Sequence, residues 1–306
     1  MTPPMEGVPS RTDIEHRALA AMLGAAVGDA LGATTEFMKP AQIREIFGVH
    51  KEIVGGGWLD LAPGQVTDDT EMTLCVARAI MANDRWDLVG IADRFAQWFA
   101  GNPVDVGATI RRGIERYLEY RQLHVPPGTR DAGNGAVMRV APVALFTLGD
   151  EKQMAQFALE QARLTHNHPL SDAACVAVGM MIQFGILGYP AQTVRAVADE
   201  LVEMHPEFRF DDYEGDATAY VADTMRTALN AFFTTASFEE CLVKAVNRGD
   251  DADTTASIVG SIAGAWYGLD SIPSRWLATL DPVVYAELSM LAPKLVDLSP
   301  LLSGKE

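Results

Sequence analysis

The chain has 306 residues, and its 24 Lys and Arg against 41 Asp and Glu give a formal charge of −17 at pH 7. This charge argues against a surface that binds a nucleic-acid backbone, although metal ions or helix N-termini can still attract a phosphate ligand. Hydrophobic residues make up 48% and charged residues 21%, a composition that favours a substantial core over a disordered chain.

Residues 1–12 lack the basic and apolar regions of a signal peptide, and predict a flexible tail before one domain of residues 13–306. No apolar run is expected to approach the roughly 18–20 residues that a membrane span requires. Three widely spaced cysteines lie among apolar residues and predict buried free thiols: Cys75, Cys175 and Cys241. Because neither a zinc spacing nor a disulfide framework is visible, we expect a reducing, cytoplasmic location.

Apolar residues recur at helical spacing along the whole chain, and no segment shows the alternating polarity of a convincing strand. The expected helices, in chain order, are residues 18–33, 71–81, 88–99, 107–120, 151–164, 171–187, 191–203, 218–233, 238–246, 254–267 and 283–291. Short turns rich in glycine and proline separate them, without a long linker or a regular repeat. The sequence therefore predicts a single all-α domain.

Two of these expected helices carry glycine at every fourth position, namely Gly24, Gly28 and Gly32, then Gly260, Gly264 and Gly268. Residues four apart share one face of a helix, so each stripe is a flat surface that another backbone can approach closely. Each glycine costs about 1 kcal/mol relative to alanine inside a helix, which tight packing must offset. Membrane helices use the same pattern to dimerise, but the nearby aspartates and short segments favour two central helices of the fold.

The first acidic cluster, Thr-Asp-Asp-Thr-Glu at residues 67–71, directly precedes the apolar face of an expected helix. Helix capping explains part of it, with Thr67 or Asp68 as the N-cap and Glu71 completing a capping box. Capping leaves Asp68 and Asp69 as adjacent carboxylates, which repel each other unless a cation lies between them.

The second acidic cluster contains Asp250, Asp251 and Asp253, and it precedes a helix of small and apolar residues. Capping explains one of these carboxylates, and Arg248 is the only cation close in sequence. Two such clusters in one chain predict a metal site. Carboxylate and threonine oxygens suit Mg²⁺ or Mn²⁺ rather than zinc or copper(I). At least four aspartates require two cations, and such a pair, about 3.5–4 Å apart, can orient a water and polarise substrate oxygens.

Other candidate site residues have two interpretations each. Glu36, beside Phe37 and after a close-packed helix, is either a partly desolvated acid–base group or an exposed helix-end glutamate. Asp29 within that helix either packs and hydrogen-bonds or supports the site. The Gly-Asn-Gly-Ala loop at residues 133–136 either exposes backbone N–H groups to a diphosphate or is a simple turn. His166 either contacts a ligand or is structural.

Together these motifs resemble the ADP-ribosylglycohydrolase family over nearly the whole chain. The Thr-Asp-Asp and Asp-x-Asp-Thr pair is specific to that family. Pro-Val-Asp-Val-Gly and His-Asn-His-Pro point to the branch that reverses arginine ADP-ribosylation of the nitrogenase iron protein. The segments that carry the resemblance are residues 28–33, 55–58, 64–72, 103–107, 132–136, 165–174 and 251–255.

The resemblance implies a compact all-α fold with a dinuclear centre, in which Mn²⁺ is preferred to Mg²⁺. The residues that match the metal ligands of the family are Thr67, Asp68, Asp69, Asp251, Asp253 and Thr254. Glu36 matches a carboxylate close to the metals and the scissile bond, and Asp105 one that touches the terminal ribose. Substrate-facing positions are matched by Gly133, Asn134, Gly135 and His166. Asp250 stands where this branch is expected to have glycine, a departure that concerns substrate preference.

The implied activity is hydrolysis of the N-glycosidic bond of ADP-ribosyl-arginine on a protein, through a transition state with oxocarbenium character. Either Glu36 or Asp105 would transfer the proton, and a ring-opened ribose intermediate engaged by Asp105 is the alternative route. The implied partners are the ADP-ribosylated nitrogenase iron protein and a PII signalling protein. Recruitment to the inner membrane would need a protein receptor, because the negative charge opposes adsorption to anionic lipids.

Three other interpretations stay open at this point. The chain could hydrolyse ADP-ribose from another protein or from a small molecule. An isoprenoid-diphosphate synthase is also all-α with Mg²⁺-binding aspartates, but it expects two Asp-Asp-x-x-Asp helices, and here the first such motif ends in Met72. A non-catalytic ADP-ribose-binding protein would be expected to lose acidic ligands, whereas this sequence keeps the full set.

Overall fold

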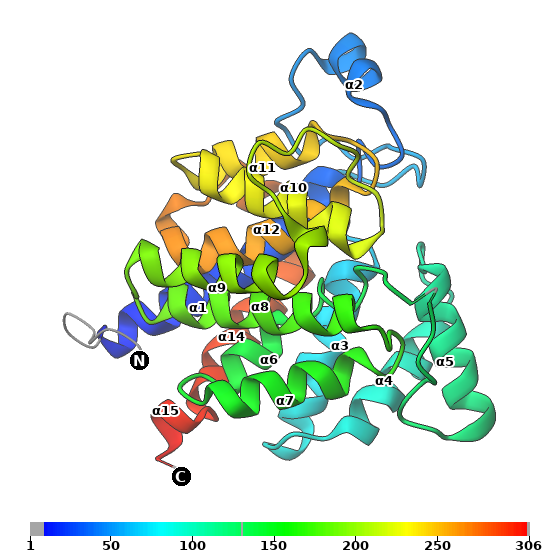
Figure 1. The fold of residues 1–306 in the computed structure, drawn as a ribbon, viewed down its shortest axis with the longest axis vertical. Coiled ribbons are helices and arrows are strands. Elements are labelled where there is room, and N and C mark those ends of the chain that lie inside the picture. The colour runs from blue at the N-terminus through cyan, green and yellow to red at the C-terminus, as the bar shows by residue number, and fades with distance from the viewer. Residues whose placement is uncertain (1–8, 130, 305–306) are drawn as a thin grey trace.

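Helices account for the regular structure of the computed structural model, which describes residues 9–129 and 131–304 (Figure 1). They are α1 (Arg11–Gly32), α2 (Pro40–Phe47), α3 (Asp68–Asn83), α4 (Leu88–Ala100), α5 (Ala108–Tyr120), α6 (Ala141–Phe146), α7 (Glu151–Ala162), α8 (Pro169–Ile186), α9 (Ala191–Met204), α10 (Val221–Thr234), α11 (Phe238–Val246), α12 (Ala252–Tyr267), α13 (Ser274–Thr279), α14 (Pro282–Asp297) and α15 (Pro300–Ser303). Within the described residues, β-structure is limited to two isolated bridges. The predicted all-α fold is confirmed.

Every helix predicted from periodicity is present, with ends that differ by a few residues. The helices that periodicity did not predict are α2, α6, α13 and α15, none longer than eight residues. Such segments are too short to show a repeat of 3.6 residues over several turns. Helix α14 also continues past residue 291 and contains Pro293.

The first helix of the chain starts close to residue 13, where the single domain is predicted to begin. Helix α1 begins at Arg11, because the hydroxyl of Ser10 accepts a hydrogen bond from the backbone N–H of Asp13 at 3.1 Å. Such a cap satisfies an amide that has no partner inside the helix. Residues 1–8 of the predicted tail lie outside the described part of the chain.

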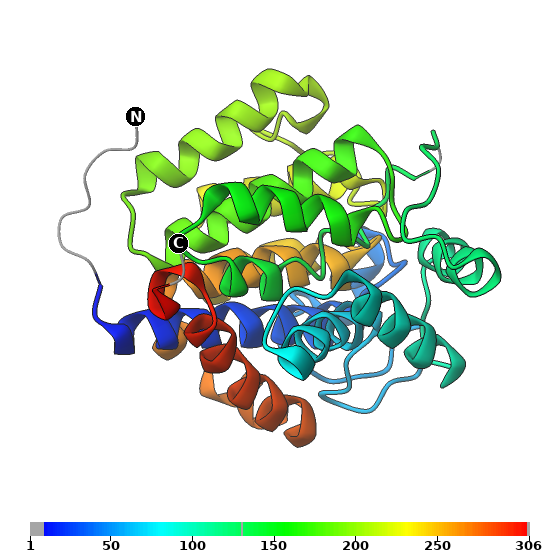
Figure 2. The same cartoon turned by 90° about the horizontal axis from the view of Figure 1, so that it is seen from below.

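Helices α1 and α12 run antiparallel through the centre of the molecule, and their glycine stripes face each other (Figures 1 and 2). A Cβ atom added to Gly24 would lie 2.3 Å from the carbonyl oxygen of Gly260, and one added to Gly28 would lie 2.1 Å from that of Ala256. These distances are too short for any side chain, so glycine alone permits this backbone contact. The prediction of two central, closely packed helices is confirmed.

The end of the second stripe differs from the prediction. Gly268 lies just after α12 with φ of +83°, and a Cβ there would meet no atom closer than 4.0 Å. It ends the helix in a conformation that suits glycine rather than taking part in the contact. At the opposite end of the pair, Gly32 lies against the backbone of Ala252. The antiparallel contact therefore brings the chain after α1 beside the start of α12.

The other helices cover this central pair. Figure 2 shows α8 and α7 on one side of it and α14 on the other, while α10 and α11 pack against α12. Contrary to expectation, one apolar segment is long enough to cross a membrane by length and composition, namely α8. In this structure 72% of that helix is buried, between α7, α9 and α12.

The three cysteines are free and buried, as predicted. Burial raises the pKa of the Cys75 thiol to about 11 and that of Cys241 to about 12, and it raises the pKa of Cys175 as well. These thiols are therefore protonated at neutral pH and act as small apolar side chains of the core.

Candidate metal centre and ligand pocket

The start of α3 is capped by a neighbouring helix. Asp29 of α1 accepts hydrogen bonds from the backbone N–H and hydroxyl of Thr67, at 3.0 and 2.9 Å, and from those of Thr70, at 3.1 and 2.6 Å. The predicted capping box is wrong, because the Thr67 side chain makes no cap bond and Glu71 accepts from Trp98. Asp29 thus satisfies the amides of Thr67 and Thr70, so the side chains of Asp68 and Asp69 are not used as the cap and are free for another role.

Residues of the two acidic clusters meet at this point. The hydroxyl of Thr254 donates to Asp69 Oδ2 at 3.1 Å, although 185 positions separate them in the chain. The hydroxyl of Thr67 lies 3.5 Å from Asp253 Oδ2. The other oxygen of each aspartate, Asp69 Oδ1 and Asp253 Oδ1, is buried without a hydrogen-bond partner. Buried polar atoms are almost always paired, so two such oxygens in one cluster indicate a missing ligand.

Glu36 belongs to the same cluster rather than to the surface. It is 4% exposed, and oxygens of Glu36, Asp251 and Asp253 lie within 4.8 Å of one another. Its carboxylate accepts a hydrogen bond from the indole N–H of Trp58. The alternative of an exposed helix-end glutamate is therefore wrong, and Glu36 is a candidate metal ligand as well as a candidate acid–base group.

The carboxylates of this cluster lack ion-pair partners in the described part of the chain. Among the described residues, no lysine or arginine forms an ion pair with the carboxylates of Glu36, Asp68, Asp69, Asp105, Asp251 or Asp253. Arg248, the only cation close in sequence to the second acidic cluster, pairs with Glu214 instead. The nearest positive ends of helix dipoles are the N-termini of α3 and α12, which carry four of these aspartates.

Burial without counter-charge raises the pKa of each carboxyl. Desolvation is the largest cause for Glu36, whose pKa rises to about 8, and for Asp68, Asp69 and Asp253, whose pKa values rise well above the usual range. Repulsion from the other carboxylates adds to the shift of each one. A bound cation would remove both causes, and the donors present, carboxylate and hydroxyl oxygens, suit a hard divalent ion.

A pocket of about 620 Å³ opens beside the acidic cluster, a size typical of small-molecule sites. Its wall includes Asp68 and the half-buried Asp105, both predicted as site residues. The backbone N–H of Gly107 donates to Asp68 Oδ2 at 3.3 Å, which ties the segment carrying Asp105 to α3. The remaining predicted residues in the wall are Glu36, Gly133, Asn134, Gly135, His166, Asp251 and Thr254.

The loop at residues 133–136 lies in the pocket wall, but one of its amides is already used. The backbone N–H of Asn134 donates to the carbonyl of Ala219 at 3.2 Å, so it is not free for a diphosphate. The side chain of Asn134 donates to Asp251 and, at 2.9 Å, to Thr224. Asn134 therefore holds Asp251 in place, a contact that sequence alone did not reveal.

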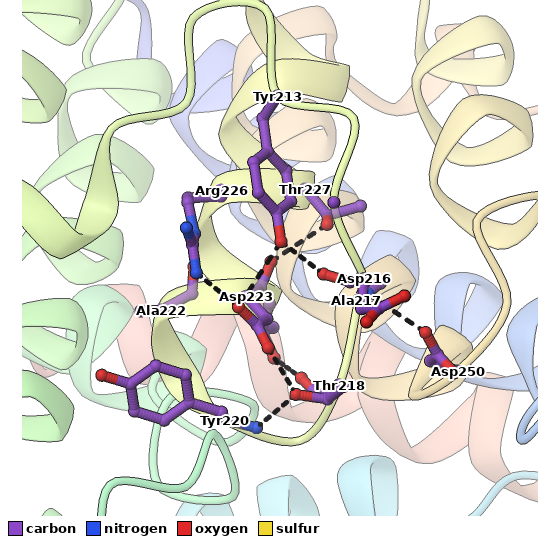
Figure 3. Close-up of polar contacts among 12 residues, drawn as sticks. Tyr213, Asp216, Ala217, Thr218, Tyr220, Ala222, Asp223, Arg226, Thr227 and Asp250 are labelled. Atoms are coloured by element: carbon purple, nitrogen blue, oxygen red, sulfur yellow. Dashed lines mark hydrogen bonds and ion pairs between the residues drawn. The ribbon is translucent and has the colours of Figure 1, made fainter.

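The segment that brings Tyr220 to the pocket is fixed by polar contacts around Asp223 (Figure 3). The carboxylate of Asp223 accepts hydrogen bonds from Thr218 and Arg226, and Tyr213 lies above it. Tyr220 also donates its backbone N–H to the hydroxyl of Thr218 at 3.3 Å, so hydrogen bonds join the two ends of this segment. Ala219 and Tyr220 of this segment line the pocket.

Asp250 connects this segment to the chain that follows α1. Its carboxylate accepts from the backbone N–H of Ala217, at 3.3 Å, and from Lys39, at 2.7 Å (Figure 3 shows the first). Its φ of +52° lies in the left-handed region, where glycine is favoured and aspartate is tolerated. This conformation explains why glycine was expected here.

The rim of the pocket contains two aromatic residues that the sequence analysis did not assign to the site. Phe37 and Trp58 are 63% and 53% exposed, and their rings meet edge to face at 5.2 Å. Trp58 follows three glycines with positive φ, and a Cβ on Gly57 would lie 2.3 Å from the carbonyl oxygen of Ala33. The only sequence signal was this glycine triplet before an aromatic residue.

The fold and this site belong to a known class of enzyme. The family model described as ADP-ribosylglycohydrolase matches residues 10–303, so the chain belongs to the ADP-ribosylglycohydrolase family and is a hydrolase. It is 48% identical over 288 residues to the ADP-ribosyl-[dinitrogen reductase] glycohydrolase of Rhodospirillum rubrum, covering 94% of this chain and 98% of that one. The resemblance inferred from the motifs is confirmed.

Two further comparisons agree with this assignment. The chain is 31% identical over 307 residues to the ADP-ribosylarginine hydrolase Tri1 of Serratia proteamaculans, covering 93% of this chain and 80% of that one. A solved structure described as an ADP-ribosylglycohydrolase-related protein complex superposes with a TM-score of 0.83 at 33% identity, covering 94% of this chain and 99% of that one.

Proposed function

We propose that this protein hydrolyses the N-glycosidic bond between ADP-ribose and an arginine side chain of a protein, and that its substrate is the nitrogenase iron protein, whose activity it restores. The observation that carries the proposal is the group of buried carboxylates without counter-charge at the wall of the pocket. The names of two relatives support the substrate, since one acts on dinitrogen reductase and the other on ADP-ribosylarginine.

The proposed cofactor is a pair of divalent cations, with Mn²⁺ preferred to Mg²⁺. The unpartnered oxygens of Asp69 and Asp253 fit this cofactor, because a cation would satisfy both. When bound, the cations would polarise ribose hydroxyls and lower the pKa of a water molecule. The proposed ligands are Thr67, Asp68, Asp69, Asp251, Asp253 and Thr254, to which the geometry adds Glu36.

The chain itself supplies two carboxyl groups for proton transfer. Hydrolysis breaks the bond from the anomeric carbon to nitrogen and forms one to a water oxygen. The departing nitrogen gains a proton, and the water loses one. Glu36, in the pocket wall with one oxygen held by Trp58, is placed to pass a proton to the departing nitrogen. Asp105 in the same wall can accept the proton of the water, and its negative charge would stabilise oxocarbenium character.

The route through a ring-opened ribose uses the same two side chains differently. In that route Asp105 engages the opened sugar, and Glu36 alone exchanges protons. In either route Trp58 holds one oxygen of Glu36, so the second oxygen is the one available to substrate. The variant Asp105→Asn distinguishes the two routes. In the ring-opened route it should leave the opened ribose unprocessed, and in the direct route it should slow cleavage of the N-glycosidic bond.

The proposed test uses nitrogenase iron protein ADP-ribosylated on a defined arginine, with mass spectrometry to follow the loss of ADP-ribose. Wild-type protein with Mn²⁺ should remove the group, and a chelator should stop the reaction. The matched control is Asp270→Asn, which changes an exposed aspartate away from the pocket. Retention of ADP-ribose on the iron protein, while free ADP-ribosyl-arginine is cleaved, would favour a different target.

We also propose a cytoplasmic location, with a PII signalling protein as regulator and a protein receptor for any recruitment to the inner membrane. The support is the resemblance to the nitrogenase-regulating branch and the charge of −17, which opposes direct binding to anionic lipids. A pull-down with PII protein and ADP should recover this chain. Failure to recover it would remove the regulator from the proposal and leave the activity untouched.

A further inference from the structure

His166 lies in the pocket wall with one ring nitrogen paired and the other open. The side chain is 2% exposed, and its Nδ1 lies 2.8 Å from the hydroxyl oxygen of Thr165. Nε2 has no hydrogen-bond partner among the residues that the structure describes, yet the residue lines the pocket. Nε2 is therefore the atom that His166 can offer to a ligand.

Two glycines keep this nitrogen uncovered. A Cβ atom on Gly133 would lie 3.0 Å from Nε2 of His166, and one on Gly135 would lie 3.1 Å from Cε1. Neither glycine has the positive φ that favours glycine for conformational reasons. A side chain at either position would crowd the imidazole edge, and one at Gly135 would also meet Ile110 Cδ1 at 2.9 Å.

A buried arginine determines the direction of the hydrogen bond to Nδ1. Arg139 Nη2 lies 2.8 Å from the hydroxyl oxygen of Thr165, and arginine only donates, so Thr165 must accept there. The hydroxyl then has one proton left, and the acceptor within reach of it among the described residues is His166 Nδ1. If Nδ1 donated instead, the hydroxyl would receive two donors and its own proton would have no acceptor.

Each guanidinium nitrogen of Arg139 has a partner, although that of Nη1 is the weak acceptor Met72 Sδ at 3.7 Å. It is fully buried, and Nε donates to the side chain of Gln161 at 2.8 Å, while Nη2 also donates to the Gln161 carbonyl at 3.1 Å. Its guanidinium lies 4.7 Å from the ring centre of Phe95. Burial lowers the pKa of Arg139 to about 10, so it stays charged at neutral pH.

The imidazole is neutral in this setting, which makes the position of its single proton matter. Burial lowers the pKa of His166 well below its usual value, and the positive charges of Arg139 and Arg112 lower it further. A neutral imidazole carries one N–H, and the hydrogen bond at one nitrogen decides which atom bears it.

We propose that Arg139 and Thr165 are positioning residues that fix His166 as the Nε2–H tautomer, so that the pocket presents a neutral N–H donor to an acceptor oxygen of ADP-ribose. The identity of the ligand rests on the proposed function, whereas the tautomer depends only on the protein. Gly133 and Gly135 complete the arrangement by leaving the donor uncovered.

Nuclear magnetic resonance of protein with ¹⁵N-labelled histidine tests the tautomer directly. The chain has 6 histidines, and His166→Gln identifies the His166 signals by their loss. Wild-type protein and Thr165→Ser, which keeps the hydroxyl, should both show the proton on Nε2. Thr165→Val removes the hydroxyl and should give a mixture of tautomers. A proton on Nδ1 in wild-type protein, or an unchanged Nε2–H in Thr165→Val, would overturn the proposal.

Calorimetric binding of ADP-ribose to the Mn²⁺-loaded protein gives the functional readout. Thr165→Val should weaken binding by about 3- to 10-fold, the range expected for one misplaced hydrogen bond, and Thr165→Ser by less than about 2-fold. Equal affinity of all three proteins would also contradict the proposal. The wild-type spectrum decides the tautomer even where Thr165→Val does not fold. If the spectra agree but no ADP-ribosyl-arginine is cleaved, the proposed function fails and the tautomer assignment stands.

Discussion

The buried guanidinium of Arg139 and the buried acidic cluster differ in how many of their polar atoms have hydrogen-bond partners. The guanidinium of Arg139 is fully buried and donates to Gln161 and Thr165. In the acidic cluster, by contrast, one oxygen each of Asp69 and Asp253 has no partner. Both arrangements bury charge without an ion pair, so burial alone does not identify a ligand site.

The difference shows which buried charge is stabilised by hydrogen bonds within the protein and which one needs a ligand of opposite charge. A buried charge that is fully hydrogen-bonded is part of the structure, and removing it leaves its partners unpaired. A buried cluster of like charges with open oxygens is stable only when something else supplies the opposite charge. We therefore expect substitutions in the two groups to act in opposite directions on the protein without metal.

The largest effect is expected on activity from Asp253→Asn. Loss of groups that merely orient metal ligands costs about 10–100-fold in affinity or activity, so loss of a proposed ligand should reduce cleavage of ADP-ribosyl-arginine by at least about 100-fold. The measurement is initial rate against Mn²⁺ concentration, with Asp270→Asn as the matched exposed control. Full cleavage with unchanged Mn²⁺ dependence in Asp253→Asn would end the metal assignment.

A second prediction concerns stability in the presence of a chelator. Asp253→Asn removes one repelling charge and should increase the free energy of unfolding of the metal-free protein. Arg139→Met should decrease it, by about 1–3 kcal/mol for each buried acceptor left unpaired, namely on Gln161 and Thr165. Denaturant unfolding measures both. If the free energy of unfolding changed with the same sign in both variants, the proposed difference between Arg139 and the acidic cluster would be wrong.

The pH dependence of the free energy of unfolding of the metal-free protein is a third test of this comparison. The pKa of Glu36 is raised from 4.5 to about 8 in the folded protein, so the folded state binds more protons than the unfolded state between these values. The free energy of unfolding should then fall as pH rises through this window. Saturating Mn²⁺ should flatten the slope, because bound cations hold the carboxylates ionised in the folded state. Equal slopes with Mn²⁺ and with chelator would contradict the assignment.

The smallest effect is expected from Asp250→Gly, next to the pocket residue Asp251. Glycine accepts the φ of +52° without strain, but it loses the ion pair with Lys39, in which the lysine is 58% exposed. Exposed pairs contribute about 0–1 kcal/mol, so the melting temperature should change little. The KM for the protein substrate should change more than kcat, since Asp250 does not line the pocket and pairs with Lys39 rather than with the buried carboxylates. A loss of kcat with unchanged KM would place Asp250 in the chemistry instead.

Much of the candidate site could be predicted from the sequence because most of its carboxylates lie in two short segments. The Thr-Asp-Asp and Asp-x-Asp-Thr signatures identified the carboxylates, and the glycine stripes identified two central helices, which the structure confirms. That the stripes pack against each other was not predictable from either segment. Thr67 is the N-cap residue of α3, as the capping interpretation allowed, but the capping box with Glu71 is absent and the capping bonds come from Asp29 on another helix.

The amino-acid sequence by itself determined the all-α fold and the helices long enough to show a period, and it supplied the carboxylate and hydroxyl residues that we propose as metal ligands. The tertiary structure decided which of them meet, because the antiparallel contact of α1 and α12 brings Glu36 beside Asp251 and Asp253. It also decided that Arg139 lies behind His166, since hydrogen bonds between distant segments leave no periodic signal in the sequence.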